Sequence, residues 1–148
     1  MKKNIIAVLV LFVLFSQCTG IRPKNLGIKD NKFSECPATP NCVNSLSAEK
    51  DDKEHYIVPL KYSSSKTAAY EKLLSVLATL PRVKIIEQKQ DYIYAEFTSL
   101  VFRFVDDVEF YFGIENVIHF RSASRLGYSD MGVNRKRIEE IKDLFNKN

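Results

Sequence analysis

Apolar residues recur every three or four positions in two stretches of the chain, and this period predicts two helices. The first stretch follows three serines at 63–65, which can cap a helix, and it stops at Pro81, which disfavours helical geometry just before it. The second begins near Met131 or Asn134 and ends at Phe145. Its apolar face is formed by Ile138, Ile141 and Phe145.

Five further segments have the length and apolar content of strands, at 56–60, 83–87, 92–98, 100–112 and 117–124. Pro59 lacks a backbone N–H, so the first strand is expected at an edge of the sheet. Short loops join the last four segments, which favours an antiparallel meander. We therefore predict an α+β fold: a two-layer domain in the order β-α-β-β-β-β-α, with two helices covering the sheet.

Residues 1–17 have the features of a signal peptide, because two lysines precede an apolar run at 5–15. This run is too short to cross a bilayer core of about 30 Å as a helix. Cys18 follows it in a segment that resembles a lipobox, so we expect a lipid on Cys18, with a short transmembrane anchor or ordinary cleavage nearby as alternatives. The expected location is the cell envelope, and Thr19 favours the outer membrane by its resemblance to known sorting rules.

The mature chain divides into a polar tether, which with the lipidated N-terminus covers 18–32, and a single domain at 33–148. The whole chain has 22 basic and 18 acidic side chains, and two of the lysines lie in the predicted signal peptide. The remaining balance is too weak to indicate nucleic-acid binding. Cys36 and Cys42 are predicted to form a disulfide in the oxidising envelope, with two free thiols as the alternative, because their spacing is not that of a zinc site.

The segment 100–112 alternates in a way that assigns its residues to two faces of a strand. One face is apolar except for Asp106, and it consists of Leu100, Phe102, Phe104, Asp106, Val108, Phe110 and Phe112. We expect this face in the core, where the carboxylate of Asp106 needs a partner, with Ser124, Arg125 or backbone groups near 127–134 as candidates.

Joining Phe112 to Ile118 in a hairpin predicts that Glu109 lies opposite Arg121, Tyr111 opposite His119, and Asp106 opposite Ser124. One interpretation is a ladder of charges that stiffens the hairpin. The other is a site for an anion or polar ligand on the exposed face, at the start of the last helix. Its candidate residues are Arg121, Arg125, Asp107, Glu109, His119 and Arg135. Asp106, Ser124, Asp130 and Asn134 would have structural roles, with Asp130 or Asn134 capping the helix.

Known catalytic motifs are missing from the sequence, and two histidines are too few for a histidine-rich metal site, so no cofactor or metal is expected. The residues favour a non-catalytic module that binds an envelope protein or a small ligand at a membrane surface. One alternative is a hydrolase that uses His119 with Asp107 or Glu109. Another is a carrier of a small apolar or anionic molecule, suggested by the ten phenylalanines, which a packed aromatic core also explains.

Two long motifs then point to a family. The first is the Cys36–Cys42 loop with the Val43-Asn44-Ser45 that follows it, and the second combines 102–110 with 121–138. Together they resemble the bacterial and plastid family called domain of unknown function 1499, over about 33–145. The resemblance implies envelope lipoproteins among its members, and it implies no activity, cofactor or catalytic residue.

Overall fold

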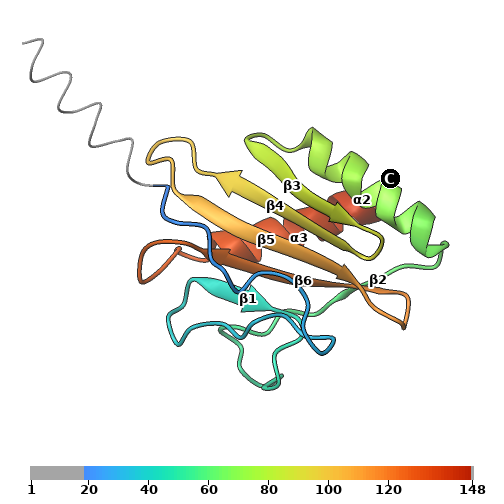
Figure 1. The fold of residues 1–148 in the computed structure, drawn as a ribbon, viewed down its shortest axis with the longest axis horizontal. Coiled ribbons are helices and arrows are strands. Elements are labelled where there is room, and N and C mark those ends of the chain that lie inside the picture. Colours follow the sequence, from blue (N-terminus) through green and yellow to red (C-terminus); the bar gives the residue numbers. More distant parts are fainter. Residues whose placement is uncertain (1–18, 148) are drawn as a thin grey trace, which may run out of the picture.

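The structure is a computed structural model that describes residues 19–147. The predicted signal peptide at 1–17 and the predicted lipidation site Cys18 lie outside the described residues. Within them, one antiparallel sheet has the strand order β1-β6-β5-β4-β3, and β2 pairs with the same edge of β6 as β1 (Figure 1). The strands are β1 (Cys42–Asn44), β2 (Leu60–Lys61), β3 (Val83–Lys89), β4 (Tyr92–Thr98), β5 (Val105–Phe112) and β6 (Val117–Ser124).

Two helices, α2 (Lys66–Thr79) and α3 (Val133–Lys147), cover one face of this sheet (Figure 1). The predicted α+β fold and the meander of β3 to β6 are confirmed, and β1 is an additional strand that was not predicted. None of the described helices is long and apolar enough to cross a membrane.

The core lies between the helices and the sheet. Helix α2 begins after Ser65, whose hydroxyl accepts a hydrogen bond from the Ala68 N–H at 3.2 Å, and its N-cap is therefore the last of the three predicted serines. It buries Leu73 and Leu77, among others, and α3 buries Ile138, Ile141 and Phe145 as predicted. These side chains meet Phe110, Phe112 and Phe120 of the sheet. Each fully buried side chain of this size contributes about 1.5–3 kcal/mol.

The strand predicted at 100–112 begins only at Val105, and this part of the prediction is wrong. Strands β4 and β5 already pair at Thr98 and Val105, so residues 99–104 form a loop. The Ser99 N–H donates to the Phe104 carbonyl at 2.8 Å, and Arg103 has a positive φ of 58°. Phe102 is consequently 56% exposed, and Leu100 and Phe104 are exposed with it instead of lying in the core.

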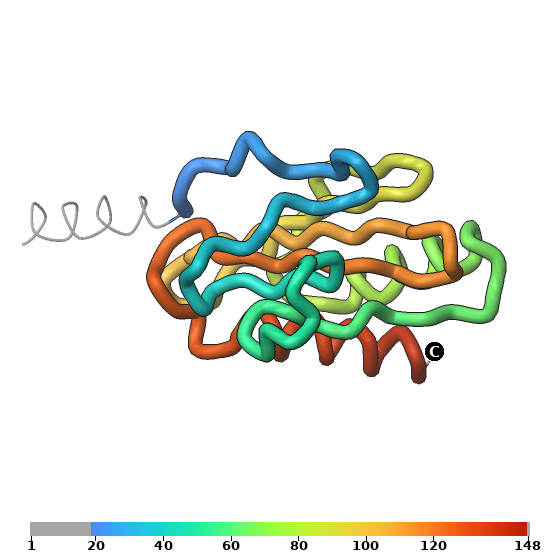
Figure 2. Tube along the Cα trace, turned by 90° about the horizontal axis from the view of Figure 1, so that it is seen from below, coloured from blue at the N-terminus to red at the C-terminus, as the bar shows by residue number. Residues whose placement is uncertain are grey.

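The segment at 20–34, of which residues 20–32 were predicted as part of a tether, lies along the face of the sheet opposite the helices (Figure 2). Arg22 bonds to Glu96 at its beginning, and near its end Phe33 is buried against Tyr92 and Tyr94. We call residues 20–34 the N-terminal strap. Because the strap covers this face, the charged side chains expected in solvent are largely buried.

Candidate functional site

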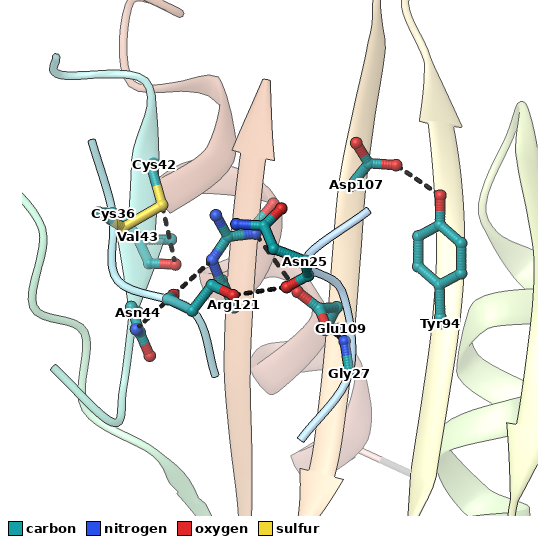
Figure 3. Close-up of polar contacts among 12 residues, drawn as sticks. Asn25, Gly27, Cys36, Cys42, Val43, Asn44, Tyr94, Asp107, Glu109 and Arg121 are labelled. Carbon is teal, nitrogen blue, oxygen red and sulfur yellow. Dashed lines mark hydrogen bonds and ion pairs between the residues drawn. A yellow bond between two sulfur atoms is a disulfide. The ribbon is translucent and has the colours of Figure 1, made fainter. Parts of the chain in front are cut away.

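Arg121 and Glu109 form one ion pair beneath the strap (Figure 3), in the register predicted from the hairpin. Arg121 Nη1 lies 3.3 Å from Glu109 Oε2, and Arg121 Nε donates to the Ser34 carbonyl at 2.8 Å. Glu109 is fully buried and also accepts hydrogen bonds from the Gly27 N–H at 2.6 Å and the Tyr92 hydroxyl at 2.8 Å. Burial raises the pKa of Glu109, against the opposing effects of these partners.

A second cluster surrounds Arg125, directly after β6. Its Nε donates to Asp107 Oδ2 at 2.9 Å and its Nη2 to Asp107 Oδ1 at 2.7 Å, which is a bidentate arrangement. Nη2 also pairs with Glu96 Oε1, the oxygen that Arg22 of the strap also binds, and the Tyr94 hydroxyl donates to Asp107. The hydrogen bonds to Asp107 and Glu96 raise the pKa of Arg125 despite its burial. Its guanidinium is thus bound by two carboxylates.

Asp106 faces the helices, as the strand parity predicted, but its partner comes from α3. Arg137 Nη2 lies 2.5 Å from Asp106 Oδ2, whereas the predicted partners were Ser124, Arg125 or backbone groups near 127–134. Arg137 Nη1 donates to Asn134 Oδ1 at 2.6 Å and to Ser122 Oγ at 3.1 Å. The partner was missed because the long-range contact between β5 and α3 leaves no local pattern.

The residues predicted to be structural at the start of α3 hold the helix against β6. Asp130 Oδ2 accepts from the Asn134 N–H at 2.7 Å, which is a capping contact. Asn134 is fully buried and donates to Ser124 Oγ and to the Asn41 carbonyl, each at 3.0 Å. Arg135, a ligand candidate, instead donates to the backbone carbonyls of residues 53, 54 and 56.

His119 is separated from the carboxylates proposed as its catalytic partners. Its Nδ1 lies 3.3 Å from Ser45 Oγ, its ring stacks on Tyr111 at 6.3 Å, and within the described residues neither Asp107 nor Glu109 hydrogen-bonds to it. Ser45 Oγ accepts from the Phe120 N–H at 2.8 Å. Burial lowers the pKa of His119, which favours the neutral imidazole.

A cleft of about 300 Å³ opens between the end of α2, the start of α3 and the adjoining ends of β4 and β5. The Asp106–Arg137 pair and Phe97 line it, and Arg137 lies over the Phe97 ring with its Cζ 4.8 Å from the centroid. Arg82 and Lys136 also line the cleft, and both are exposed. Neither Arg82 nor Lys136 was predicted as a site residue. The one local feature of the sequence that pointed to this cleft was Arg137, a charged residue next to the apolar face of α3.

The disulfide between Cys36 and Cys42 is present, as predicted, and it joins β1 to the preceding loop (Figure 3). Within residues 19–147, His, Cys, Asp and Glu side chains form no group of three or more that could hold a metal ion.

These features define a small α+β domain whose sheet carries paired charges on both faces. The chain belongs to the family described as "Protein of unknown function (DUF1499)", which matches residues 32–145. The predicted family resemblance is thereby confirmed. No curated protein and no solved structure matches the chain.

Proposed function

We propose that this protein is a lipid-anchored protein of the cell envelope, exported by its signal peptide and attached through Cys18. Its domain is a non-catalytic module that binds a small anionic ligand at the membrane surface. The observation that carries the binding role is the cleft beside Asp106 and Arg137, whose volume of about 300 Å³ is at the lower end for small-molecule sites.

The charges around this cleft favour an anion. Asp106 neutralises Arg137, and the two positive charges of Arg82 and Lys136 then exceed the single negative charge of Glu140. Phe97 adds an apolar wall. A ligand with a phosphate or carboxylate group and a small apolar part matches this combination, since pockets use a few placed polar groups within an apolar lining.

The contacts of the sheet support a non-catalytic role. A general base or nucleophile needs a reactive atom that faces substrate, and proton transfer needs it within hydrogen-bond reach. Asp107 and Glu109 are instead buried against Arg125 and Arg121. Four ligand candidates that we predicted to be exposed are instead buried in clusters that the strap contacts: Asp107, Glu109, Arg121 and Arg125. The cleft on the helix side therefore replaces them as the proposed site.

A hydrolase is the second candidate, favoured by the contact between Ser45 Oγ and His119 Nδ1 at 3.3 Å. Ser45 is 5% exposed, and its oxygen already accepts the Phe120 N–H. This geometry holds the serine within the sheet and leaves its oxygen poorly placed to attack a substrate.

Mass spectrometry of the protein purified from its native membrane tests the proposal. We expect a diacylglycerol thioether on Cys18 and a co-purifying anionic molecule. Lys136→Glu should remove that molecule, and Lys61→Glu on β2 should retain it, because Lys61 is also exposed but does not line the cleft. A ligand held equally by both variants would place the site elsewhere, and an unmodified Cys18 would contradict the anchor.

The catalytic alternative has its own test. Wild-type protein incubated with p-nitrophenyl butyrate should show no turnover above background. Turnover that is lost in both Ser45→Ala and His119→Gln would contradict the non-catalytic role.

A further inference from the structure

We propose that one end of the domain is a bilayer-docking surface, made by the loop at 99–104, the segment at 126–133 and the start of the strap. We call it the apolar end. It carries large, exposed apolar side chains: Ile21, Leu100, Val101, Phe102, Phe104, Leu126, Tyr128, Met131 and Val133. The inference deepens the proposed function, because it rests on a membrane-attached protein and states how the domain meets the membrane.

The topology brings these segments together. The loop at 99–104 connects β4 to β5, and the Arg125 N–H donates to the Val105 carbonyl at 3.1 Å, so the segment after β6 leaves the sheet at the same end. Gly20 lies against Leu126: a Cβ on that glycine would be 3.1 Å from Leu126 Cγ. Both loops and the beginning of the strap lie at the left of the domain in Figure 1.

The distribution of exposed apolar groups is uneven. Single exposed apolar residues are normal on a protein surface, but a contiguous group marks an interaction site. Among the described residues, Val58 and Ile114 are the exposed large apolar side chains that lie away from the apolar end. The rings of Phe102 and Phe104 lie 5.7 Å apart in the same loop, which concentrates aromatic surface there.

The charges and aromatic groups favour lipid as the occupant. Arg103 lies exposed within the apolar loop, and exposed Arg82 and Lys136 lie in the neighbouring cleft. Surfaces that insert into the interfacial layer combine apolar and aromatic side chains with Lys and Arg, which attract anionic lipids. Asp130, the acidic residue within the segment 126–133, is engaged by the N–H groups of Gly132 and Asn134.

The position of the chain supplies an independent argument. Arg22 is fixed to the sheet by Glu96, with Nη2 2.5 Å from Oε1. Cys18 lies four positions before Arg22, and a fully extended chain of four residue steps spans at most about 14 Å. A lipid on Cys18 would therefore hold the apolar end close to the bilayer, whereas a free tether over 18–32 would allow the domain any orientation.

The absence of tryptophan from the sequence allows a direct test with single-tryptophan variants. Phe102→Trp and Tyr128→Trp place the reporter at the apolar end. Ile114→Trp is the matched control, because Ile114 is 91% exposed in the turn between β5 and β6, at the other end of the sheet. The full protein, purified from its native membrane, is reconstituted into vesicles of phosphatidylethanolamine and phosphatidylglycerol, with or without brominated acyl chains.

We expect brominated lipid to quench most of the emission of Phe102→Trp and Tyr128→Trp, and to leave that of Ile114→Trp nearly unchanged. Equal quenching of all three variants, or none, would overturn the proposal. A blue shift at the apolar end without quenching would also overturn it, since a second copy or another protein would then cover the surface. If the mass spectrum shows no lipid on Cys18 but the apolar-end tryptophans are still quenched, the anchor alone is refuted. If the lipid is present but these tryptophans are not quenched, docking alone is refuted.

Discussion

Replacing Asp106 by alanine should reveal how much the buried ion pair between β5 and α3 stabilises the domain. The two side chains are 11% and 12% exposed, and Asp106 Oδ2 lies 2.5 Å from Arg137 Nη2. Without the carboxylate, Arg137 keeps two neutral acceptors, Ser122 and Asn134. Breaking one partner of a buried pair costs about 3–5 kcal/mol, because the remaining charge is uncompensated. We therefore expect Asp106→Ala to lower the free energy of unfolding by about that amount.

A double-mutant cycle measured by urea unfolding checks this reasoning on a chain that begins at Thr19 and contains every described element. Asp106→Ala combined with Arg137→Met should be less destabilised than the sum of the two single variants, with a coupling of about 0.5–3 kcal/mol. Glu140→Ala is the control, because this exposed carboxylate lines the same cleft and its removal should change stability by less than about 0.5 kcal/mol. If Asp106→Ala costs no more than Glu140→Ala, the ion pair is not structural.

The histidines and the disulfide give further predictions. Burial lowers the pKa of His119, so the contribution of this residue to stability is present above the pKa of the unfolded chain, about 6.5, and is lost as the pH falls. Urea midpoints measured between about pH 7 and 5 should therefore fall less for His119→Gln than for the wild type. Burial also opposes charge on His55, but the hydrogen bonds with Asp52 and the Thr39 carbonyl, together with the charges of Asp52 and Glu54, outweigh burial and raise the His55 pKa. The contribution of His55 to stability is therefore present below about pH 6.5 and is lost as the pH rises, and His55→Gln should flatten that loss; equal pH profiles for the two histidine variants would contradict both signs. Reducing the Cys36–Cys42 bond should lower the free energy of unfolding by about 2.4 kcal/mol, as loop-closure entropy predicts for a seven-residue ring, and an unchanged urea midpoint in dithiothreitol would refute this.

The hairpin of β5 and β6 shows what local pattern can determine. A short connection fixes the register of an antiparallel pair of strands. Because side chains alternate between the two faces, the register then determines the face on which each side chain lies. The predicted pairs of Glu109 with Arg121 and Asp106 with Ser124 are both present for this reason. The inward direction of Asp106 followed from the same parity.

The same alternation gave a wrong prediction at 100–104, because it does not distinguish a strand whose apolar face is buried from a loop with exposed apolar side chains. The burial of the sheet face opposite the helices could not be predicted from local sequence pattern either. The contacts of the strap join residues far apart in sequence, such as Gly27 with Glu109 and Arg22 with Glu96, and the strap has no apolar period of its own. The charged residues of the hairpin were predicted correctly. Their exposure to solvent depends on the strap, whose sequence resembles that of a linker.

The cleft and the apolar end adjoin each other, and this constrains the ligand. Thr98 and Ser99 line the cleft at the base of the exposed loop, and Val133 belongs to both surfaces. A domain docked by the apolar end would hold the cleft at the level of the lipid head groups, with Arg82 and Lys136 directed to the region where phosphate groups are concentrated. The strap would keep that orientation, because it ties the first described residues to Glu96 and Glu109 along the sheet. An anionic ligand that enters the cleft from the membrane would then contact Arg82, Lys136 and the Phe97 ring together.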